Sequence, residues 1–527
     1  MALTPTRAEA ARFLGHAALG YNSSDIEAVR QAGFDAWMDR QFTAWRQTSH
    51  WDWLSQRYSP TTPGVTDGDL GTSVWRRFIE GRDLLRQKIT FALSEILVTS
   101  VRNNIAGFTG YGGASYLDML EERAFGNFRD ILQGISSSLF MAYYLTFRGS
   151  RKADAQGTQQ PDENYARELL QLFTIGLFVL DDAGNPVAVD NSFQQAYTQA
   201  DVEALARVFT GWDADIPDWP GAYARWKRPM VNSPVNFDSG AKSFSFAPGI
   251  TIPAGASPQD NMRLALDAIF QHPNVGPFIG KQLIQKLVTS NPSPDYVRRV
   301  AAAFNNDGHG VRGDMKAVIK AILMDPDLLD AEGRRNGMGP HPEQFGKLRE
   351  PATRLVQFAK AFNMKSKTGN WWTDRHRVWE YFRNVGQEPM KSPSVFNFYR
   401  PDYSPPGTDF SLPSQERLLG PEFQITTESS VIGYVRAMAT IIGWSLRDPN
   451  LECAADYSGW LPKASDATAL VNELNVLLAA GRLSPSTMAL MTRAINTMPM
   501  ATSDQRENRI KTAALLVMSA PEYITQK

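Results

Sequence analysis

Residues 161–178 read Pro-Asp-Glu-Asn-Tyr-Ala-Arg-Glu-Leu-Leu-Gln-Leu-Phe-Thr-Ile-Gly-Leu-Phe. They predict a helix over 162–176, because Asp162 is placed to cap its first turn and Gly176 to end it in a left-handed conformation. Two faces follow from the helical period. The apolar face, expected to pack in the core, carries Tyr165, Leu169, Leu172 and Phe173, and the polar face carries Asn164, Arg167, Glu168 and Gln171.

The polar face of this motif helix has two interpretations. In the first it is an ordinary solvated face, supported by a Glu163–Arg167 pair at i, i+4 that contributes about 0.2–0.5 kcal/mol. In the second it lines a cleft, where Glu163 or Glu168 transfers a proton and Arg167 holds a partner carboxylate ionised. The spacing of the residues leaves both interpretations open.

The same helical period dominates the rest of the chain and predicts a mainly α protein, a large multi-helix globular assembly. A small extended or hairpin excursion is expected near 222–252, where aromatic and branched residues stand among Pro, Gly, Ser and Asn. We expect a main helical domain over 1–330 and a C-terminal helical part over 331–527, packed together as one body. Helices are predicted at 7–42 (two segments), 72–100, 114–147, 260–270, 275–289, 294–305, 313–324, 343–364, 372–384, 425–445, 466–480, 484–497 and 503–519.

The composition indicates which kinds of partner and environment the protein does not favour. The 527 residues carry a formal net charge of -1, so no basic excess points to nucleic acid. No apolar run reaches the roughly 18–20 residues that span a bilayer, and the first residues lack the order of a signal peptide. Cys453 is the single cysteine, which excludes an internal disulfide.

Further candidates surround the motif helix in sequence. Asp201 forms a capping-box pattern with Thr198 and follows the motif helix closely enough to face Glu163. With Glu163, Arg167 and Glu168 it completes the set of catalytic candidates. The ligand-binding candidates are Asn164, Tyr197, Trp212 and His272. Trp212 suits stacking on a sugar ring but equally suits core packing, and His272 before Pro273 suits a helix cap as well as a ligand contact.

No metal or cofactor is expected from the motifs. The six histidines include no pair at i, i+3 or i, i+4, the spacing of a helical metal site. The chain also has no Gly-rich phosphate loop, no dinucleotide fingerprint and no Gly-x-Ser-x-Gly elbow.

The motif resembles the signature of a bacterial family of proteins of unknown function, the domain of unknown function numbered 1800. Its core stands here as Glu163-Asn164-Tyr165-Ala166-Arg167-Glu168-Leu169, followed in the right order by a block over 197–212. Later blocks that resemble the family lie at 272–280, 287–292, 347–351, 392–398 and 421–426. In one departure, Asn236-Phe237-Asp238 stands where members often carry a histidine, so we do not expect a histidine metal site there.

The resemblance implies a largely helical, exported protein in the periplasm or outside the cell, although the chain as given would also fit the cytoplasm. The resemblance carries over no reaction, and two functions remain as expectations, the first of them drawn from the acids Glu163, Glu168 and Asp201 together with Arg167. One is a hydrolase that cleaves a glycan with its carboxylates, so that a polysaccharide is the substrate. The other is a non-catalytic scaffold or accessory protein for an alkaline-phosphatase-like partner, which the resemblance implies through the frequent pairing of the two families.

Overall fold

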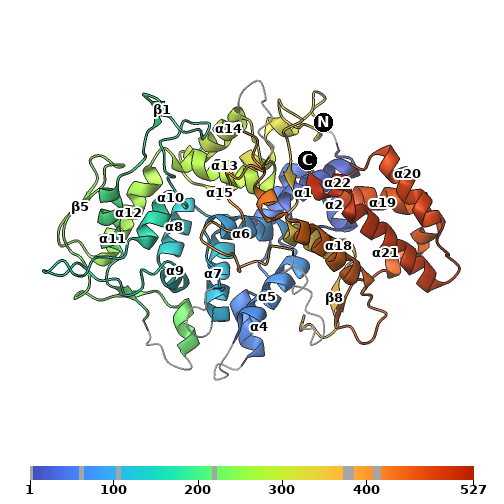
Figure 1. The fold of residues 1–527 in the computed structure, drawn as a ribbon, viewed down its shortest axis with the longest axis horizontal. Coiled ribbons are helices and arrows are strands. Elements are labelled where there is room, and N and C mark those ends of the chain that lie inside the picture. The colour runs from blue at the N-terminus through green and yellow to red at the C-terminus, as the bar shows by residue number, and fades with distance from the viewer. Residues whose placement is uncertain (1–3, 59–64, 103–108, 216–221, 372–384, 407–416) are drawn as a thin grey trace.

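A computed structural model describes residues 4–58, 65–102, 109–215, 222–371, 385–406 and 417–527 of the chain. Helices pack on helices throughout these ranges (Figure 1). The first half contains α1 Arg7–Ala17, α2 Ser23–Ala32, α3 Phe34–Phe42, α4 His50–Arg57, α5 Asp67–Glu80, α6 Leu84–Ile96, α7 Thr109–Arg123, α8 Phe128–Ser136, α9 Leu139–Tyr144, α10 Asn164–Gln171, α11 Gln199–Val208 and α12 Pro258–Gln271. The second half contains α13 Val275–Leu287, α14 Pro294–Asn305, α15 Met315–Leu323, α16 Pro351–Ala361, α18 Glu428–Gly443, α19 Ala467–Ala479, α20 Pro485–Asn496, α21 Ser503–Ser519 and α22 Pro521–Ile524.

Most helices begin at a residue that satisfies their first free N–H groups. Thr6, Asn22, Thr66, Thr198 and Thr502 each form a capping box with the residue three positions on. The helices α12, α14 and α20 start instead with a Ser-Pro pair, in which proline occupies the position that needs no N–H donor. These local signals explain why helix positions are readable from the sequence.

The predicted mainly α class is confirmed, and several predicted helices are broken into shorter ones. The segment 7–42 forms three helices because Gly33, at φ 78°, ends α2 and begins α3. Between α5 and α6 the chain turns at Gly81, where a Cβ atom would lie 2.5 Å from the carbonyl oxygen of Arg77. The helix predicted at 372–384 lies outside the described residues.

Strand structure is confined to two-residue antiparallel ladders in the described residues. The expected extended excursion near 222–252 is confirmed by β4 and by the β5–β6 ladder, although it opens with the short 3-10 helix η1. The pairs are β1 Ala188–Val189 with β2 Ser192–Phe193, β3 Trp212–Asp213 with β4 Val231–Asn232, β5 Lys242–Ser243 with β6 Thr251–Ile252, β7 Lys347–Leu348 with β10 Thr525–Gln526, and β8 Lys365–Ser366 with β9 Cys453–Ala454. The 3-10 helices are η1 Ala222–Lys227, η2 Pro326–Leu328, η3 Pro421–Ile425 and η4 Ser458–Ser465.

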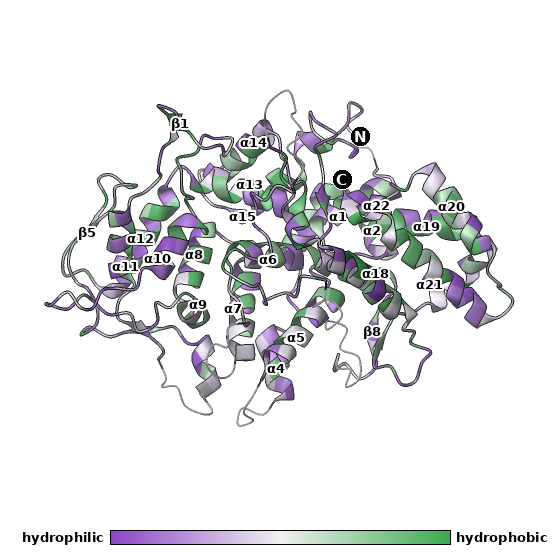
Figure 2. Cartoon of the chain, in the orientation of Figure 1, coloured by the Kyte–Doolittle hydropathy of each residue, from purple (hydrophilic) through white to green (hydrophobic). Residues whose placement is uncertain are grey.

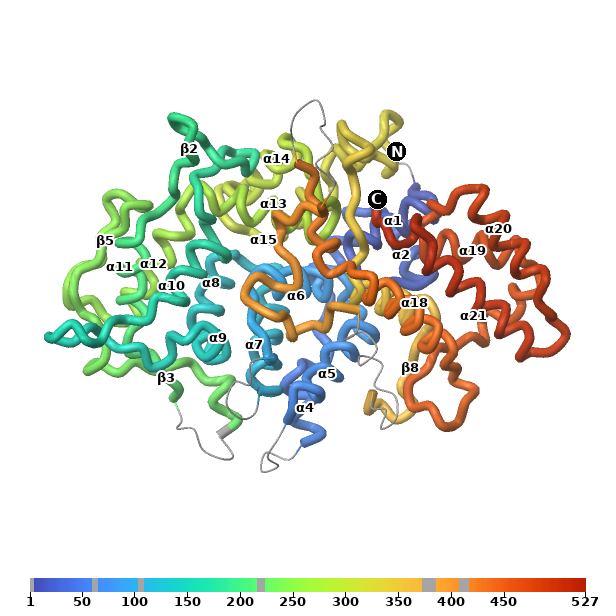
Figure 3. The backbone as a smooth tube through the Cα atoms, in the orientation of Figure 1, coloured from blue at the N-terminus to red at the C-terminus, as the bar shows by residue number. Residues whose placement is uncertain are grey.

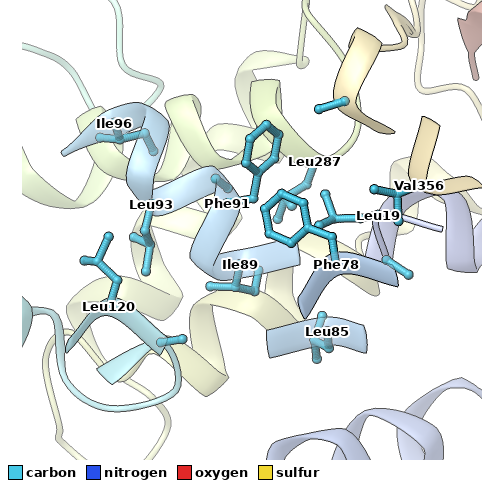
Figure 4. Close-up of a cluster of buried hydrophobic side chains, with 14 of the residues drawn as sticks. Leu19, Phe78, Leu85, Ile89, Phe91, Leu93, Ile96, Leu120, Leu287 and Val356 are labelled. Atoms are coloured by element: carbon cyan, nitrogen blue, oxygen red, sulfur yellow. The ribbon is translucent and has the colours of Figure 1, made fainter. Parts of the chain in front are cut away.

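The core is organised around α6, in which every residue except Ser94 is buried. Side chains from five other parts of the chain surround it (Figure 4). They include Leu19, Phe78, Leu120, Leu287 and Val356. A helix that is covered on all sides belongs to the centre of a large core, whereas the outer helices alternate apolar and polar residues (Figure 2).

The two predicted parts of the chain share this core. One cluster of buried hydrophobic residues extends from Ala10 to Tyr523. The helix α16 packs on α5, α19 packs on α1, and the C-terminal strand β10 pairs with β7. The division near residue 330 stays a prediction, but residues on both sides of it contribute to the same interior.

Candidate active site

The motif helix is α10, and its apolar face packs as predicted. Tyr165, Leu169 and Phe173 are fully buried. The ring of Tyr165 stacks on Phe147 with centroids 4.4 Å apart, and its hydroxyl shares a 2.6 Å hydrogen bond with Ser136. This anchoring fixes the rotation of the helix and therefore turns the opposite, polar face toward the surface.

The helix is shorter than predicted, ending at Gln171 and not near Gly176. The N–H groups of Ile175 and Gly176 both bond to the carbonyl of Leu170, which tightens the last turns, and Gly176 adopts φ 78°. At the other end the N-cap residue is Glu163 and not the predicted Asp162, although Asp162 does accept a 2.9 Å hydrogen bond from the N–H of Asn164. Asp162 and Gly176 therefore lie at the two ends of the motif as expected, but the regular α-helix between them covers only 164–171.

Glu163 and Arg167 form the expected ion pair at the rim of this face. The Arg167 Nη2 atom lies 2.8 Å from Glu163 Oε2, and Gln199 Nε2 on α11 donates to the same oxygen at 2.9 Å. The side chains of Glu163 and Arg167 are 35% and 41% exposed. The pair is open to solvent, and α11 helps to position it.

Glu168 differs from Glu163 because it is half-buried. Burial raises the pKa of its carboxyl group, and the opposing charge of Arg167 does not outweigh that effect. Its Oε2 atom is buried and has no hydrogen-bond partner among the described residues. The raised pKa means that this carboxyl group keeps its proton to a higher pH than an exposed glutamate does, which suits a proton donor.

Two tyrosines flank Glu168. Burial raises the pKa of Tyr197 and that of Tyr144 to about 12, and the charge of Glu168 contributes in both cases. Both phenols therefore stay neutral near pH 7 and can donate hydrogen bonds beside the carboxyl group.

Asp201 is held by hydrogen bonds of its own and does not bond to Glu163. Its carboxylate accepts from the N–H and hydroxyl of Thr198 at 2.7 and 2.8 Å, and from the N–H and hydroxyl of Ser245 at 2.5 Å each. Burial raises its pKa, but the hydrogen bonds from Ser245 and Thr198 outweigh burial and hold the pKa below the usual range. With 2% of its surface exposed, Asp201 joins the start of α11 to the segment after β5, and we assign it a positioning role.

The ligand-binding candidates are dispersed. Asn164 is exposed at the start of α10, and Tyr197 is half-buried beside Glu168. Trp212 is buried in the β3–β4 ladder opposite Asn232, so neither face of its ring is free for stacking. His272 ends α12, where its Nδ1 accepts from the N–H of Asn274 at 3.1 Å, and burial together with the charge of Arg312 lowers its pKa to about 4. The structure thus brings Asn164 and Tyr197 to the motif helix and places Trp212 and His272 in the packing around it.

A pair of buried glutamates forms a second polar centre, which is not among the candidates predicted from the sequence. Gln387 Nε2 donates to Glu95 Oε1 at 3.0 Å and to Glu350 Oε1 at 2.8 Å, so the two carboxyl groups lie side by side. Burial and the charge of Glu350 raise the pKa of Glu95 to about 7. The two groups therefore share one proton, as adjacent buried acids do.

Three buried lysines balance this acid pair. Lys286 Nζ lies 3.2 Å from Glu95 Oε2, and Lys347 Nζ lies 3.9 Å from Glu350 Oε2 and 2.9 Å from Oε1 of a third buried acid, Glu422. Burial and the charge of Lys347 lower the pKa of Lys88 to about 8. These side chains are at most 9% exposed, so the cluster is sealed from substrate and acts within the core.

Several residues of this cluster lie in the sequence blocks that resemble the family, but their spacing does not predict that they meet. Lys347 and Glu350 belong to the block 347–351 and Glu422 to the block 421–426. Asn397, whose Nδ2 donates to Glu95 Oε1 at 3.3 Å, belongs to the block 392–398, and all three blocks resemble the family. Figure 3 shows the segment after residue 385, in orange, passing across the blue helix α6 that carries Glu95. Blocks far apart in the sequence meet at one buried point.

A serine, a histidine and a glutamate also align in the core between α4, α5 and α7. Ser73 Oγ lies 3.0 Å from His50 Nδ1, and His50 Nε2 lies 3.5 Å from Glu121 Oε1. Glu121 is fully buried and bonds to Arg77 at 2.9 Å, and all three members of the alignment are buried. No substrate reaches Ser73, so the alignment belongs to a structural network and not to an esterase site.

Within the described ranges, no helix is both long and apolar enough to cross a bilayer. The same residues contain no group of three or more His, Cys, Asp or Glu side chains arranged around a metal.

Comparison with known proteins identifies a family for this chain. Neither the curated proteins nor the solved structures give a match to this chain. The family described as Protein of unknown function (DUF1800) matches residues 12–525, which is nearly the whole chain. The motif helix, the block around Asp201 and the buried acid pair all fall within that match, and the chain therefore belongs to the DUF1800 family.

Proposed function

We propose that the protein is a carboxylate-dependent hydrolase that acts on a glycan at the polar face of α10. The observation that carries the proposal is the half-buried carboxyl group of Glu168, whose raised pKa and unpartnered buried oxygen suit a proton donor. A buried polar atom without a partner lowers stability by about 1–3 kcal/mol, and a half-buried carboxyl group that keeps such an atom beside an exposed ion pair is a candidate functional group.

In this proposal Glu168 is the general acid and Glu163 is the ionised partner. Glu168 protonates the leaving glycosidic oxygen, while the carboxylate of Glu163, held by Arg167 and Gln199, activates the attacking water. The C–O bond to the leaving sugar breaks as the water oxygen bonds to the anomeric carbon, and Glu163 takes up the proton that the water loses. Tyr197 and Tyr144 supply neutral hydroxyl donors and ring surface beside the reaction.

The test is hydrolysis by the full chain of a panel of alginate, polygalacturonate, dextran sulfate and dextran, measured by the release of reducing ends. Glu168→Gln keeps the shape of the side chain but cannot protonate the leaving group, so turnover should fall by about 10²–10⁴-fold. Because the acid must be protonated, the activity should also fall as pH rises through the raised pKa of Glu168. Glu122→Gln, an exposed acid on α7, is the matched control and should keep wild-type turnover. Equal turnover by Glu168→Gln and Glu122→Gln, or no release from any glycan, would contradict the proposal.

A second candidate is a non-catalytic accessory protein that works with an alkaline-phosphatase-like partner. It is favoured by the exposed apolar face of α18, on which Val431, Ile432 and Val435 are 51%, 71% and 42% exposed. Contiguous exposed apolar side chains on a helix are typical of protein-binding surfaces. Ile432→Glu should abolish co-elution with such a partner, whereas Leu490→Glu, an equally exposed apolar position on α20, should not. Unchanged co-elution of Ile432→Glu would count against this candidate.

An exported location agrees with both candidates. A polysaccharide substrate lies outside the cytoplasm in most settings where it is degraded, so we propose that the protein acts in the periplasm or beyond it.

A further inference from the structure

A polar cleft of about 840 Å³ lies between α2, α5, α6 and α16, away from the motif helix. Its volume falls within the range of about 300–1,000 Å³ that is typical of ligand sites. None of its described lining residues belongs to α10 or to the buried acid pair. We propose that this cleft binds an anionic glycan, a sugar chain that carries carboxylate or sulfate groups.

Trp45 stands at this cleft with 82% of its surface exposed. Tryptophan buries more apolar area than almost any other side chain when it is covered, and an almost bare indole forgoes that stabilisation. An exposed flat ring beside a polar cleft offers a stacking surface for the apolar face of a sugar ring. It lies between α3 and α4, where no core packing requires an aromatic residue.

The cleft also carries the hydrogen-bonding groups that hydroxyl-rich ligands need. Asn22, Gln47 and Asn363 line it from three separate segments. The amides of Gln47 and Asn363 present donors and an acceptor, so they can bond to a sugar hydroxyl in either direction, whereas Asn22 offers its NH₂ group because its Oδ1 caps α2. This combination of planar amides and an exposed ring favours a carbohydrate over an apolar ligand.

The charges of the cleft select an anionic glycan. The described lining holds Arg76, Arg82, Lys360 and Lys365 against Asp25 and Glu80, a formal charge of +2 in a chain whose net charge is -1. Burial raises the pKa of Asp25, which weakens its opposing negative charge. A local excess of cations in a cleft concentrates anionic ligands.

Two of the cations, Lys360 and Arg76, are held in place by hydrogen bonds to backbone carbonyls. Lys360 is 9% exposed, and its Nζ atom donates to the carbonyls of Ile79 at 2.9 Å and Gly81 at 2.7 Å, which leaves one of its three donors for a ligand. Arg76 is held by the carbonyl of Thr48 at 2.9 Å. Because the protein already fixes both side chains, little conformational entropy is lost when a ligand binds.

The experiment measures binding of the full chain to sodium polygalacturonate, dextran sulfate, neutral dextran and a single-stranded oligothymidine by isothermal titration calorimetry. We expect binding to polygalacturonate or dextran sulfate, with the tighter of the two identifying carboxylate or sulfate as the recognised group. We expect no binding to dextran. Raising NaCl from about 50 to about 500 mM should weaken the affinity severalfold, because salt screens exposed charges.

Variants assign the binding to the cleft. Trp45→Ala should raise the Kd at least tenfold, Trp45→Phe should recover part of the loss, and Arg82→Gln should weaken binding to the anionic glycan. Phe193→Ala, which removes an exposed aromatic ring on the distant β1–β2 hairpin, is the matched control and should bind as the wild type does. The inference would be overturned if Trp45→Ala bound the anionic glycan with wild-type affinity. It would also be overturned if neutral dextran or oligothymidine bound as tightly as the anionic glycan.

The inference stands apart from the chemistry proposed for α10. Glu168→Gln should retain binding at the cleft even where turnover is lost. If Glu168→Gln loses turnover and Trp45→Ala binds the glycan as the wild type does, only the proposed binding at the cleft is contradicted. If Glu168→Gln keeps turnover and Trp45→Ala loses binding, only the proposed hydrolase is contradicted.

Discussion

Glu163 and Glu168 lie five residues apart on one helix but meet different surroundings. Glu163 is bonded by Arg167 and Gln199 in a solvent-exposed pair, whereas burial raises the pKa of Glu168. A carboxyl group with a raised pKa near a second, ion-paired carboxyl group is a usual basis of acid and base roles at one site. Asp201 takes neither the acid nor the base role, because Thr198 and Ser245 donate hydrogen bonds to both of its carboxylate oxygens.

The positioning role of Asp201 predicts a loss of stability in Asp201→Asn. The amide presents an NH₂ group where Oδ2 now accepts from Thr198 and from the hydroxyl of Ser245, so we expect the free energy of unfolding in urea to fall by about 2–3 kcal/mol. Because the folded pKa is lowered, the contribution is present above the unfolded pKa of about 3.9 and disappears as pH falls through the folded value. Glu203→Gln, an exposed acid on the same helix, should change stability by no more than about 0.5 kcal/mol. Equal stability of the two variants near pH 7 would refute this role.

The motif helix was predictable as an element because its signals are local. The hydrogen bond of Asp162 to the first turn, the buried Tyr165 face and the turn at Gly176 are all observed, with the N-cap residue one position later than predicted. Its last turns were not predictable, because their tightening depends on the ring of Phe278 packed beside Gly176. Trp212 shows the same limit: its polar neighbours in the sequence suggested a ligand contact, but pairing with β4 buries it.

Gly176 therefore gives a prediction at the scale of the element. An alanine there would hold φ near 78° and place its Cβ 2.9 Å from Phe278 Cε2, so Gly176→Ala should lower the free energy of unfolding by at least about 1–2 kcal/mol. Gly15→Ala is the control, since a Cβ inside α1 would meet no atom within 4 Å. That change should raise stability by about 0.5–1 kcal/mol. Thermal denaturation of the two variants measures the difference, and a Gly176→Ala protein as stable as Gly15→Ala would contradict the assignment of the turn.

At the scale of the whole molecule, the acid pair joins distant parts of the chain in one interior. Glu95 comes from α6, Glu350 from the start of α16, and Gln387 from the segment that crosses α6. No periodicity in the sequence reports such a meeting, because it depends on how the helices pack. The family blocks marked several of the participants, but only their three-dimensional arrangement shows that they converge. The exposure of Trp45 is unreadable from the sequence for the same reason.

The acid pair predicts a distinct dependence of stability on pH. The folded protein holds a proton on Glu95 up to about pH 7, whereas the unfolded chain releases it near pH 4.3, so stability from this group is full below about pH 4.3 and is lost as pH rises to about 7. Glu95→Gln mimics the protonated acid and removes this titration. Between about pH 4.5 and about pH 7.5 the wild type should lose on the order of 3 kcal/mol relative to Glu95→Gln. Urea unfolding across this range gives the result, with Glu122→Gln as the control. Parallel stability curves for wild type and Glu95→Gln would show that the pair does not share a proton.

The central claim is that the polar face of α10 holds a carboxylic acid ready to donate a proton. Its most direct measurement is a pH titration of the Glu168 side chain by NMR in protein labelled with ¹³C at the glutamate carboxyl carbons. The signal missing from Glu168→Gln assigns the resonance. The account predicts a titration midpoint above the ordinary glutamate value of about 4.3, and a midpoint at or below that value would contradict it.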